Sequence, residues 1–228
     1  MLIKKGAEAC LFLEDWQSRK VIMKRRLPKK YRLPEIDEKI RTNRTIRESQ
    51  LLHYAKEAGV PTPTIFMVDL ADSNIIMEFI EGEQLKQVLP ASTPEKRRHL
   101  NRRIGEFIGS LHNNEIVHGD LTTSNIIFTS RNKLIFIDFG LGEKTTDLEL
   151  RGVDLHLMKR AFQSTHSRIA EECFNDVLEG YIKAVGDNPA KNVLEKIDEI
   201  ERRGRYVSER RKTKNDKEVL NNNSFIHA

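Results

Sequence analysis

The sequence predicts an α+β protein of two lobes, a small β-rich N-terminal lobe and a reduced helical C-terminal lobe. Up to about residue 81, short apolar runs of strand type alternate with polar turns around one long helix-prone segment. Beyond Glu81-Gly82, apolar residues recur with helical spacing instead. We therefore expect an N-terminal lobe at 1–81, a helical lobe at 82–204 and a basic, flexible tail at 205–228.

Composition places the chain among soluble globular proteins. Of its 228 residues, 38% are hydrophobic and 32% are charged, and the net charge is only +5. Affinity for polyanions would therefore depend on how the basic residues are distributed. Cys10 and Cys173 are far apart and lack metal-ligand spacing, which indicates free thiols in a reducing compartment. No apolar stretch approaches the length of a membrane span, so we expect a cytoplasmic protein without membrane contact.

The N-terminal elements follow from strand and helix signals. Residues 7–16 and 20–26 alternate as two strands around a polar turn at 17–19. A helix is predicted over 34–58, because Gly59 suits a C-terminal cap and Pro61 prevents continuation. Two more strands are predicted at 65–69 and 74–80, joined by a polar turn at 71–73. About five strands around one helix form this lobe.

The C-terminal elements are mostly helical. Thr93-Pro94-Glu95 is typical of a helix start, with a capping hydroxyl and a proline in the first helical position. Apolar residues then fall on one face, at Leu100, Ile104, Phe107, Ile108 and Leu111. Further helices are predicted around 153–162, 169–184 and 193–202, and a hairpin of short strands at 126–128 and 134–137.

Three oxygen-bearing side chains gather around this hairpin. Asn125 precedes its first strand and Asp138 follows its second, so both lie at the same end. Mg²⁺ prefers hard oxygen ligands, a few from protein and the rest from water and phosphate. Asp120, on the preceding loop, remains free to orient or deprotonate an attacking hydroxyl or water. The pattern indicates phosphoryl transfer from a magnesium-bound nucleotide.

Phosphoryl transfer also needs positive charge near the phosphates. Lys24 ends the apolar stretch VIMK, and Glu48 in the following helix is placed to hold its ammonium group. The segment Gly6-Ala7-Glu8-Ala9 would let backbone amides approach phosphates, although a single glycine equally suits a plain turn.

These motifs together resemble those of protein kinases. VIMK, a helix glutamate, HGD-x-x-x-x-N and DFG occur in the kinase order. KKGAEA, RTIRE, HGDLTTSN, IDFGL, GVDL and AFQSTH are similar, more closely, to the small atypical kinases of the KEOPS/EKC complex, a RIO-like family. The resemblance runs from the N-terminus to His166 and implies a bilobal protein-kinase-like fold that binds ATP and Mg²⁺.

The resemblance also implies roles for the central residues. Asp120 would be the catalytic aspartate of a serine/threonine protein kinase or ATPase. Asn125 and Asp138 would carry the metal, and Lys24 with Glu48 would orient the phosphates.

Supporting roles follow in the same way. The stretch from Glu78 to Ile80 would offer backbone groups to adenine, and Asp154 would brace the catalytic loop. His118 is expected to be structural, packing under that loop.

Two departures from ordinary kinases narrow the activity. Gly119 stands where the catalytic-loop arginine is usual, so no receiver for an activating phosphate is apparent. Only a short segment separates Gly140 from Gly152, which leaves little to dock peptides. ATP hydrolysis, or action on a bound partner, therefore fits better than general protein phosphorylation.

Basic residues form two clusters. A solvated face is the ordinary interpretation of such runs, but the resembled complex makes threonylcarbamoyladenosine in tRNA, which favours tRNA contact through phosphates. Partners implied by the resemblance are the KEOPS catalytic subunit and further subunits of the complex. One cluster covers 24–32 and continues at Lys39, Arg41, Arg44 and Arg47, and the other comprises Arg202, Arg203, Arg205, Arg210, Arg211 and Lys212.

Two other functions remain open from the sequence. Small-molecule kinases of the aminoglycoside or choline type also use HGD-x-x-x-x-N, although DFG is unusual among them. A catalytically silent tRNA-binding scaffold would need only the basic residues. Each site residue alone also has a plain explanation as a cap, turn or surface charge.

Overall fold

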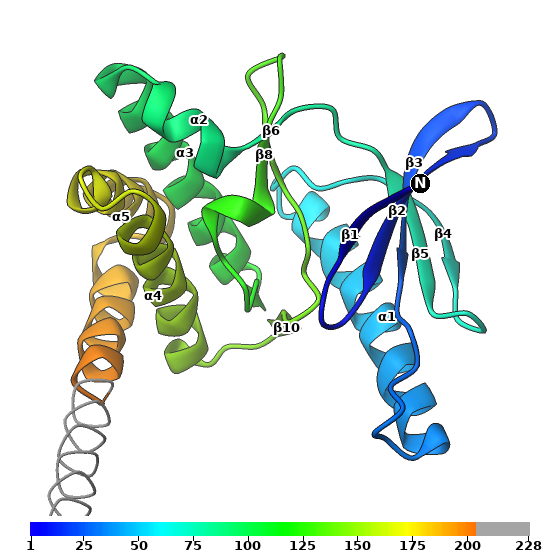
Figure 1. Ribbon diagram of the computed structural model, residues 1–228. Helices are drawn as coiled ribbons and strands as arrows, with labels where there is room; N and C mark the ends of the chain where they lie inside the picture. The colour runs from blue at the N-terminus through cyan, green and yellow to red at the C-terminus, as the bar shows by residue number, and fades with distance from the viewer. Residues whose placement is uncertain (204–228) are drawn as a thin grey trace, which may run out of the picture.

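The computed structural model of the protein describes residues 1–203 and has an antiparallel sheet in its N-terminal part and a mainly helical C-terminal part (Figure 1). This confirms the predicted α+β class. The predicted tail at 205–228 lies outside the described residues, and the predicted boundary at residue 81 stays a prediction. No helix among residues 1–203 is long and apolar enough to cross a membrane.

The N-terminal sheet has five strands in the order β1-β2-β3-β5-β4, all paired antiparallel. Gln17 and Ser18 connect β2 to β3, both with positive φ (48° and 63°), the backbone that a tight two-residue hairpin turn requires. The strands are β1 (Leu2–Lys5), β2 (Cys10–Trp16), β3 (Arg19–Arg25), β4 (Ile65–Asp69) and β5 (Asn74–Glu78).

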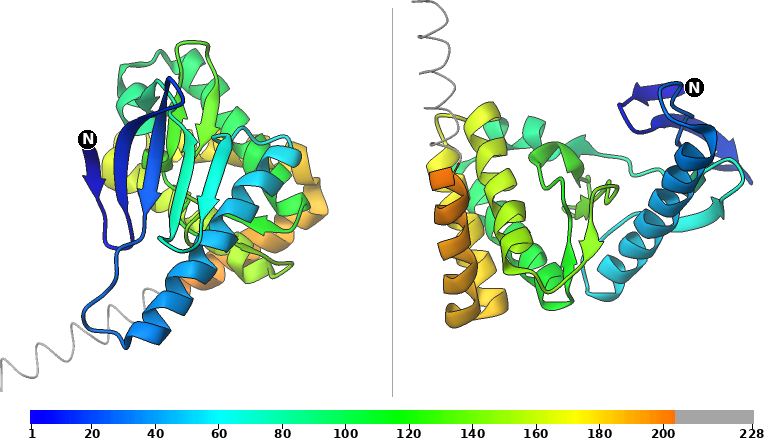
Figure 2. Two further views of the ribbon diagram at one scale, coloured as in Figure 1. Left: turned by 90° about the vertical axis from the view of Figure 1, so that its right-hand side faces the viewer. Right: turned by 90° about the horizontal axis from the view of Figure 1, so that it is seen from below.

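Helix α1 (Pro34–Glu57) lies between this sheet and the C-terminal part (Figure 2). It begins with Pro34 and ends before Gly59, whose φ of +79° reverses the chain direction as predicted. The helix contacts β4 and β5 on one side and two short C-terminal strands on the other, β7 (Ile116–Val117) and β10 (Glu143–Lys144). It therefore connects the sheet with the segments that carry the motifs HGD and DFG.

The C-terminal part is built on α3 (Pro94–Asn113), which packs against α5 (Ala170–Val185). Thr93 caps α3 as predicted, since its hydroxyl accepts a hydrogen bond from the Lys96 N–H at 3.3 Å. The remaining elements are β6 (Glu83–Gln84), α2 (Leu85–Ala91), the 3₁₀ turn η1 (Thr123–Asn125), β8 (Ile126–Phe128), β9 (Leu134–Phe136), α4 (Leu148–Thr165) and a helix over 187–203.

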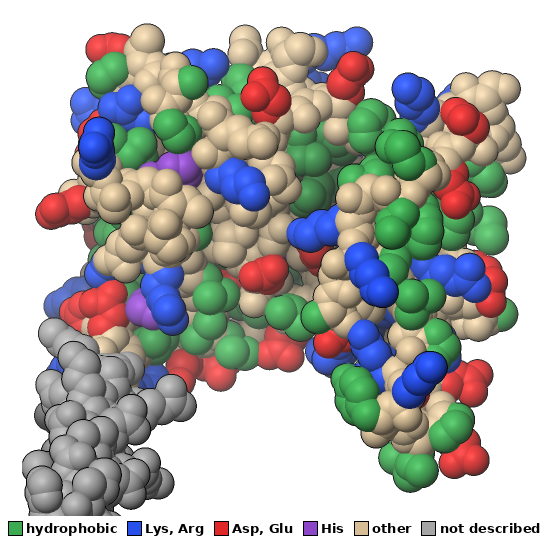
Figure 3. Space-filling view, in the orientation of Figure 1, with side chains coloured by type: hydrophobic (Ala, Val, Ile, Leu, Met, Phe, Trp, Pro, Cys, Tyr) green, Lys and Arg blue, Asp and Glu red, His purple; other side chains and the backbone are tan. Residues whose placement is uncertain are grey.

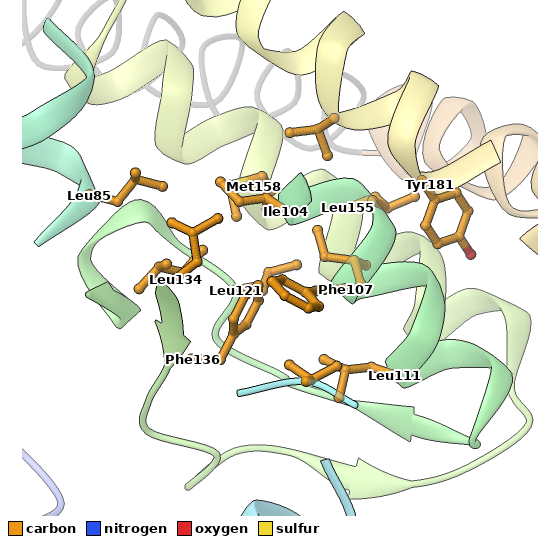
Figure 4. Packing of buried hydrophobic residues seen from close by; sticks show 14 of the residues in the cluster. Leu85, Ile104, Phe107, Leu111, Leu121, Leu134, Phe136, Leu155, Met158 and Tyr181 are labelled. Carbon is orange, nitrogen blue, oxygen red and sulfur yellow. The ribbon is translucent and has the colours of Figure 1, made fainter. Parts of the chain in front are cut away.

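Side chains from α2, α3, α4, α5 and the β8–β9 hairpin point toward one another in a continuous hydrophobic core (Figure 4). Phe107 of α3 and Phe136 of β9 meet edge to face, with ring centroids 5.8 Å apart. The hairpin that carries the predicted metal residues is thus fixed to the largest helix of this part.

Two predicted helix starts were wrong, and one short helix was missed. Helix α4 begins at Leu148 rather than near 153, because the Asp147 carboxylate caps it by accepting from the Glu149 N–H at 2.8 Å. The last helix begins at 187 rather than 193, directly after Gly186, and tolerates Pro189 because a first-turn proline has no N–H to satisfy. Helix α2 was not predicted: it is short and contains Pro90.

Candidate active site

Two adjoining cavities lie between the sheet and the C-terminal part, and both are lined by Lys24 and Asp138. The first, of about 270 Å³, is mainly apolar and also includes residues 78–80 and Asn125. The second, of about 190 Å³, is bounded by residues 6–9 and Asp120. The surface is hollowed between the two parts, with Lys and Arg side chains along the hollow (Figure 3). All predicted nucleotide and metal residues therefore border one cleft.

A larger hollow of about 870 Å³ lies elsewhere, beside α3 and the β8–β9 hairpin. It shares residues 78–80 with the cleft but includes none of Lys24, Asp120, Asn125 or Asp138. The larger hollow therefore does not coincide with these predicted site residues.

Buried charges join the sheet, helix α1 and the DFG segment. Lys24 Nζ donates to Glu48 Oε1 at 2.7 Å and to Asp138 Oδ1 at 2.6 Å. Arg26 donates to the other oxygen of Glu48 at 2.5 Å. Lys24, Arg26 and Glu48 are each at most 5% exposed, so they are held in place by one another rather than by solvent.

These ion pairs determine the protonation states of Lys24 and Asp138, the two charged residues that border both cavities. Burial alone would lower the pKa of Lys24, but the carboxylates of Glu48 and Asp138 outweigh it and raise the pKa above its ordinary value. Burial alone would raise the pKa of Asp138, but the Lys24 ammonium outweighs it and lowers the pKa. Both groups are therefore charged at neutral pH.

Asn125 and Asp120 are joined directly. The side-chain amide nitrogen of Asn125 donates to the backbone oxygen and to Oδ2 of Asp120, each at 2.9 Å. Both N–H bonds of the amide are thereby used, which leaves its oxygen as the group available to a cation. The Ile137 N–H donates to the Asn125 carbonyl at 2.9 Å and so holds the segment of Asp138 beside Asn125.

Asp154 of α4 holds the loop that carries Asp120. Its carboxylate accepts from the backbone N–H of His118 at 2.6 Å and of Gly119 at 2.8 Å. His112 Nε2 lies 3.4 Å from the same carboxylate, and His112 Nδ1 lies 2.9 Å from Tyr181 Oη. The loop is thus tied to α3, α4 and α5 together.

His118 packs beneath the loop, fully buried. Its Nε2 lies 3.1 Å from the Ile137 carbonyl oxygen, and its Nδ1 accepts from the Asp120 N–H at 3.3 Å. Its ring stacks at a tilt against Phe139, with centroids 4.4 Å apart. His118 therefore touches both the Asp120 loop and the DFG segment.

The backbone geometry at Gly119 explains why this position has a glycine in place of the usual arginine. Its φ is +77°, and a Cβ atom built there would lie 2.2 Å from the Leu141 carbonyl oxygen. A side chain at this position would need both a left-handed backbone and displacement of the segment after DFG.

The segment of residues 6–9 is fastened over the cleft. The Gly6 N–H donates to the Ala9 carbonyl at 2.9 Å, Glu8 forms an ion pair with Arg44 of α1, and Lys29 donates to the Ala7 carbonyl. These contacts close a turn that lines the smaller cavity.

The described part of the C-terminal basic cluster, Arg202 and Arg203, lies apart from the cleft. Arg203 pairs with Glu149 at 2.9 Å, and the Arg202 Nε donates to the Asp198 carbonyl at 3.3 Å. Neither residue lines the two cavities. The other members, Arg205, Arg210, Arg211 and Lys212, lie outside the described residues.

Comparison of the sequence with known protein families identifies the family of this chain. The sequence pattern of the RIO domain matches residues 14–174. The chain belongs to the RIO-domain family. Lys24, Glu48, Asp120, Asn125 and Asp138 all fall inside the matched RIO domain, whereas the segment at 6–9 precedes it.

Relatives of this RIO domain are similar over nearly all of the chain. The KEOPS complex subunit Bud32 of Pyrococcus abyssi is 50% identical over 211 residues, covering 90% of this chain and 96% of that protein. The EKC/KEOPS complex subunit bud32 of Dictyostelium discoideum is 37% identical, covering 90% of this chain and 82% of that protein.

Longer relatives match this chain over part of their own length. A probable bifunctional tRNA threonylcarbamoyladenosine biosynthesis protein of Methanothermobacter thermautotrophicus is 44% identical over 206 residues. The match covers 90% of this chain but only 36% of that protein, so the chain spans about a third of its length.

Sequence reasoning missed three residues of this chain: Arg26, His112 and Tyr181. The signal for Arg26 was its spacing of two from Lys24, which places both on one face of an extended segment. His112 and Tyr181 lie 69 residues apart and carry no local signal of their contact.

Proposed function

We propose that the protein is an atypical serine/threonine protein kinase or ATPase that uses ATP and Mg²⁺ in the cytoplasm, as part of a KEOPS-type complex that supports tRNA threonylcarbamoyladenosine formation. The observation that carries the proposal is Lys24, 5% exposed, bonded to both Glu48 and Asp138 where the two cavities meet. A buried ammonium held between two carboxylates at the wall of a cleft suits a polyphosphate.

The two cavities match the two ends of a nucleotide. The mainly apolar cavity, with Ile22, Met77 and the backbone of residues 78–80, suits a planar base with polar edges. The smaller cavity, with Lys24 and the turn at 6–9, suits phosphates.

Asn125 and Asp138 fit magnesium. The Asn125 amide oxygen remains available because its nitrogen is engaged by Asp120, and Asp138 adds an ionised carboxylate. Residues 1–203 contain no cluster of three or more His, Cys, Asp or Glu side chains suited to a metal, so further ligands would come from phosphate and water. Bound magnesium supplies charge neutralisation on the phosphate oxygens.

Asp120 is the group placed to act on the acceptor. Its Oδ2 receives the Asn125 amide N–H, and its backbone is fixed through His118, which leaves the other carboxylate oxygen to orient a serine, threonine or water O–H. Asp154 holds this arrangement through the loop backbone.

The names of the relatives support the setting. Two of them are KEOPS complex subunits and another is a tRNA threonylcarbamoyladenosine biosynthesis protein, so we propose the KEOPS catalytic subunit, other KEOPS subunits and tRNA as partners. Only a short stretch joins Gly140 to α4, so we propose that the acceptor is water or a bound partner rather than a free peptide.

The deciding experiment measures ATP turnover of the purified chain against magnesium concentration, with and without the KEOPS catalytic subunit and tRNA. Asp138→Ala should abolish magnesium-dependent turnover while the melting temperature stays within a few degrees of wild type. Asp72→Ala is the matched control, because Asp72 is an exposed aspartate that pairs only loosely with Arg25 at 3.5 Å. Unchanged turnover in Asp138→Ala would refute the enzymatic proposal.

The tRNA part has its own test. Reversing Arg210, Arg211 and Lys212 to Glu should weaken tRNA association, with a shallower dependence on salt than wild type. If the variant and wild type bind tRNA equally at every salt concentration, these charged side chains are solvated and do not contact tRNA.

A further inference from the structure

Arg26 is a second buried cation at the phosphate end of the cleft. It lies two residues after Lys24, is 3% exposed, and lines the smaller cavity with Lys24, Asp120 and Asp138. Its neighbour Arg25 points to the other face and is exposed. Burying a guanidinium costs desolvation free energy unless its charge is paired, so the contacts of Arg26 must account for its buried position.

The contacts of Arg26 centre on Glu48. One terminal nitrogen donates to Glu48 Oε2 at 2.5 Å and the other to the Thr45 hydroxyl at 3.3 Å. Within residues 1–203, its Nε is buried without a hydrogen-bond partner. Polar matching of the guanidinium is therefore incomplete, and the ion pair with Glu48 dominates.

Glu48 is shared between two cations. Its Oε1 accepts from Lys24 and its Oε2 from Arg26, so the three groups together carry a net charge of +1. A Lys24–Glu48 pair alone would carry none. Asp138, which also contacts Lys24, is assigned to the metal in the proposed function.

We propose that Arg26 is a positioning residue for phosphate binding: by neutralising Glu48, it leaves the positive charge of Lys24 available to the phosphates of the nucleotide. The inference rests on the proposed function and deepens it. Because the cluster is buried, its charge is weakly screened and acts over the short distance to the cavity it lines. The effect should require phosphates on the nucleotide and be absent for the base and ribose alone.

The test compares ligands that differ only in phosphate. Dissociation constants for adenosine, ADP and ATP are measured by calorimetry with EDTA present and again with magnesium. Arg26→Gln keeps a donor for Glu48 but removes the charge. It should weaken ADP and ATP binding about tenfold, equivalent to about 1.4 kcal/mol, and change adenosine binding less than twofold.

Three variants serve as controls. Arg26→Lys keeps the charge and should bind ADP within about threefold of wild type. Arg25→Gln removes the same charge from the exposed face of β3 and should leave all three ligands unaffected. Thr45→Val removes the neutral partner of Arg26 and should lower the melting temperature without changing the preference for ADP over adenosine.

The outcomes separate the inference from the proposed function. Equal weakening of adenosine and ADP by Arg26→Gln would show that Arg26 only supports the fold, and an unchanged ADP constant would show that its charge does not reach the ligand. A wild-type chain that binds no ADP would refute the proposed function, and the inference with it. Should Arg26→Gln not fold, the double variant Arg26→Met, Glu48→Gln retains the net charge of +1, and loss of its preference for ADP would overturn the inference.

Discussion

Two polar clusters, each containing an aspartate, differ in what surrounds them. The cleft cluster of Lys24, Arg26, Glu48 and Asp138 borders two cavities, and the side chain of Asp138 is 42% exposed. The loop-support network of Asp154, His112 and Tyr181 lies within the C-terminal part, and each member is at most 1% exposed.

This difference in exposure distinguishes an aspartate that can contact a ligand from one that holds the backbone of a loop. In the cleft cluster, Asp138 can exchange Lys24 for another cation because it faces open space. In the loop-support network, Asp154 accepts two backbone N–H groups and has no access to a ligand. A carboxylate that holds backbone donors in the interior contributes to the shape of the loop, whereas one at a cavity wall is available for chemistry.

The largest expected effect belongs to the open cleft. Asp120→Asn keeps the size of the side chain and its contact with Asn125 but removes the carboxylate that would take a proton. ATP turnover should fall about 10²–10⁴-fold, since positioned proton transfer has that value. Steady-state turnover and the melting temperature are measured together.

The melting temperature should be unchanged in Asp120→Asn, because among residues 1–203 this carboxylate accepts a hydrogen bond only from Asn125. Turnover within tenfold of wild type would mean that another group acts on the acceptor.

The loop-support network should respond differently to the same chemical change. Asp154→Asn places an amide against the N–H groups of His118 and Gly119, and each buried donor left unsatisfied costs about 1–3 kcal/mol. Stability and turnover should therefore fall together, in contrast to Asp120→Asn. Chemical denaturation and turnover of the folded fraction are the measurements.

A Tyr181→Phe variant provides the control for the network. It removes the hydroxyl near His112 but leaves both backbone contacts of Asp154, so only stability should change, by about 1 kcal/mol. Loss of stability in Asp154→Asn with full turnover would show that the loop keeps its shape without Asp154.

A third prediction concerns the glycine between the two clusters. Gly119→Ala places a Cβ on a left-handed backbone, which costs about 1–2 kcal/mol, and drives it toward the Leu141 carbonyl oxygen. For Gly59→Ala, the glycine has nearly the same φ, +79° against +77°, but no atom of the described residues lies within 4 Å of a Cβ built there. Subtracting the two losses in unfolding free energy isolates the contact with Leu141.

We expect Gly119→Ala to lose more stability than Gly59→Ala and also to lose turnover. Equal losses would show that the segment after DFG moves aside freely, and the missing arginine would then need a reason other than space.

The sequence could predict those elements that carry local signals. Helix α1 and the β8–β9 hairpin carry local signals, in Gly59 and Pro61 for the helix and in the polar turn for the hairpin, so Glu48 and Asp138 could be placed without tertiary information. Their relation to Lys24 followed from the order of the motifs.

The rest depends on packing between distant elements. Arg26 belongs to a run of three basic side chains that equally suits a solvated face. Its spacing of two from Lys24 places both on one face, but only the contact with Glu48, 22 residues away, shows that this face is buried. His112 meets Tyr181 because α3 packs on α5, a contact that neither helix encodes alone. The start of α4 was missed although Asp147 and Glu149 supplied a helix start signal.

The smallest expected effect is the pH dependence of the cleft cluster. Lys24 lowers the pKa of Asp138 below its ordinary 3.8, so the native state binds the proton less readily than the unfolded chain does. The resulting stability is present above about pH 4 and is lost as the pH falls through the lowered pKa. The destabilisation of Asp138→Asn relative to wild type should therefore stay constant between about pH 5 and 8 and shrink below about pH 4.

Denaturant titrations of wild type and Asp138→Asn at stepwise pH measure this difference. Solvent screens the half-exposed Asp138 side chain, so the change should be modest. Asp72→Asn, at an exposed pair, should show no comparable trend. A difference that persists unchanged below pH 3 would mean that the Asp138 carboxylate contributes through its shape rather than its charge, and its assignment to the open, exchangeable cluster would then be wrong.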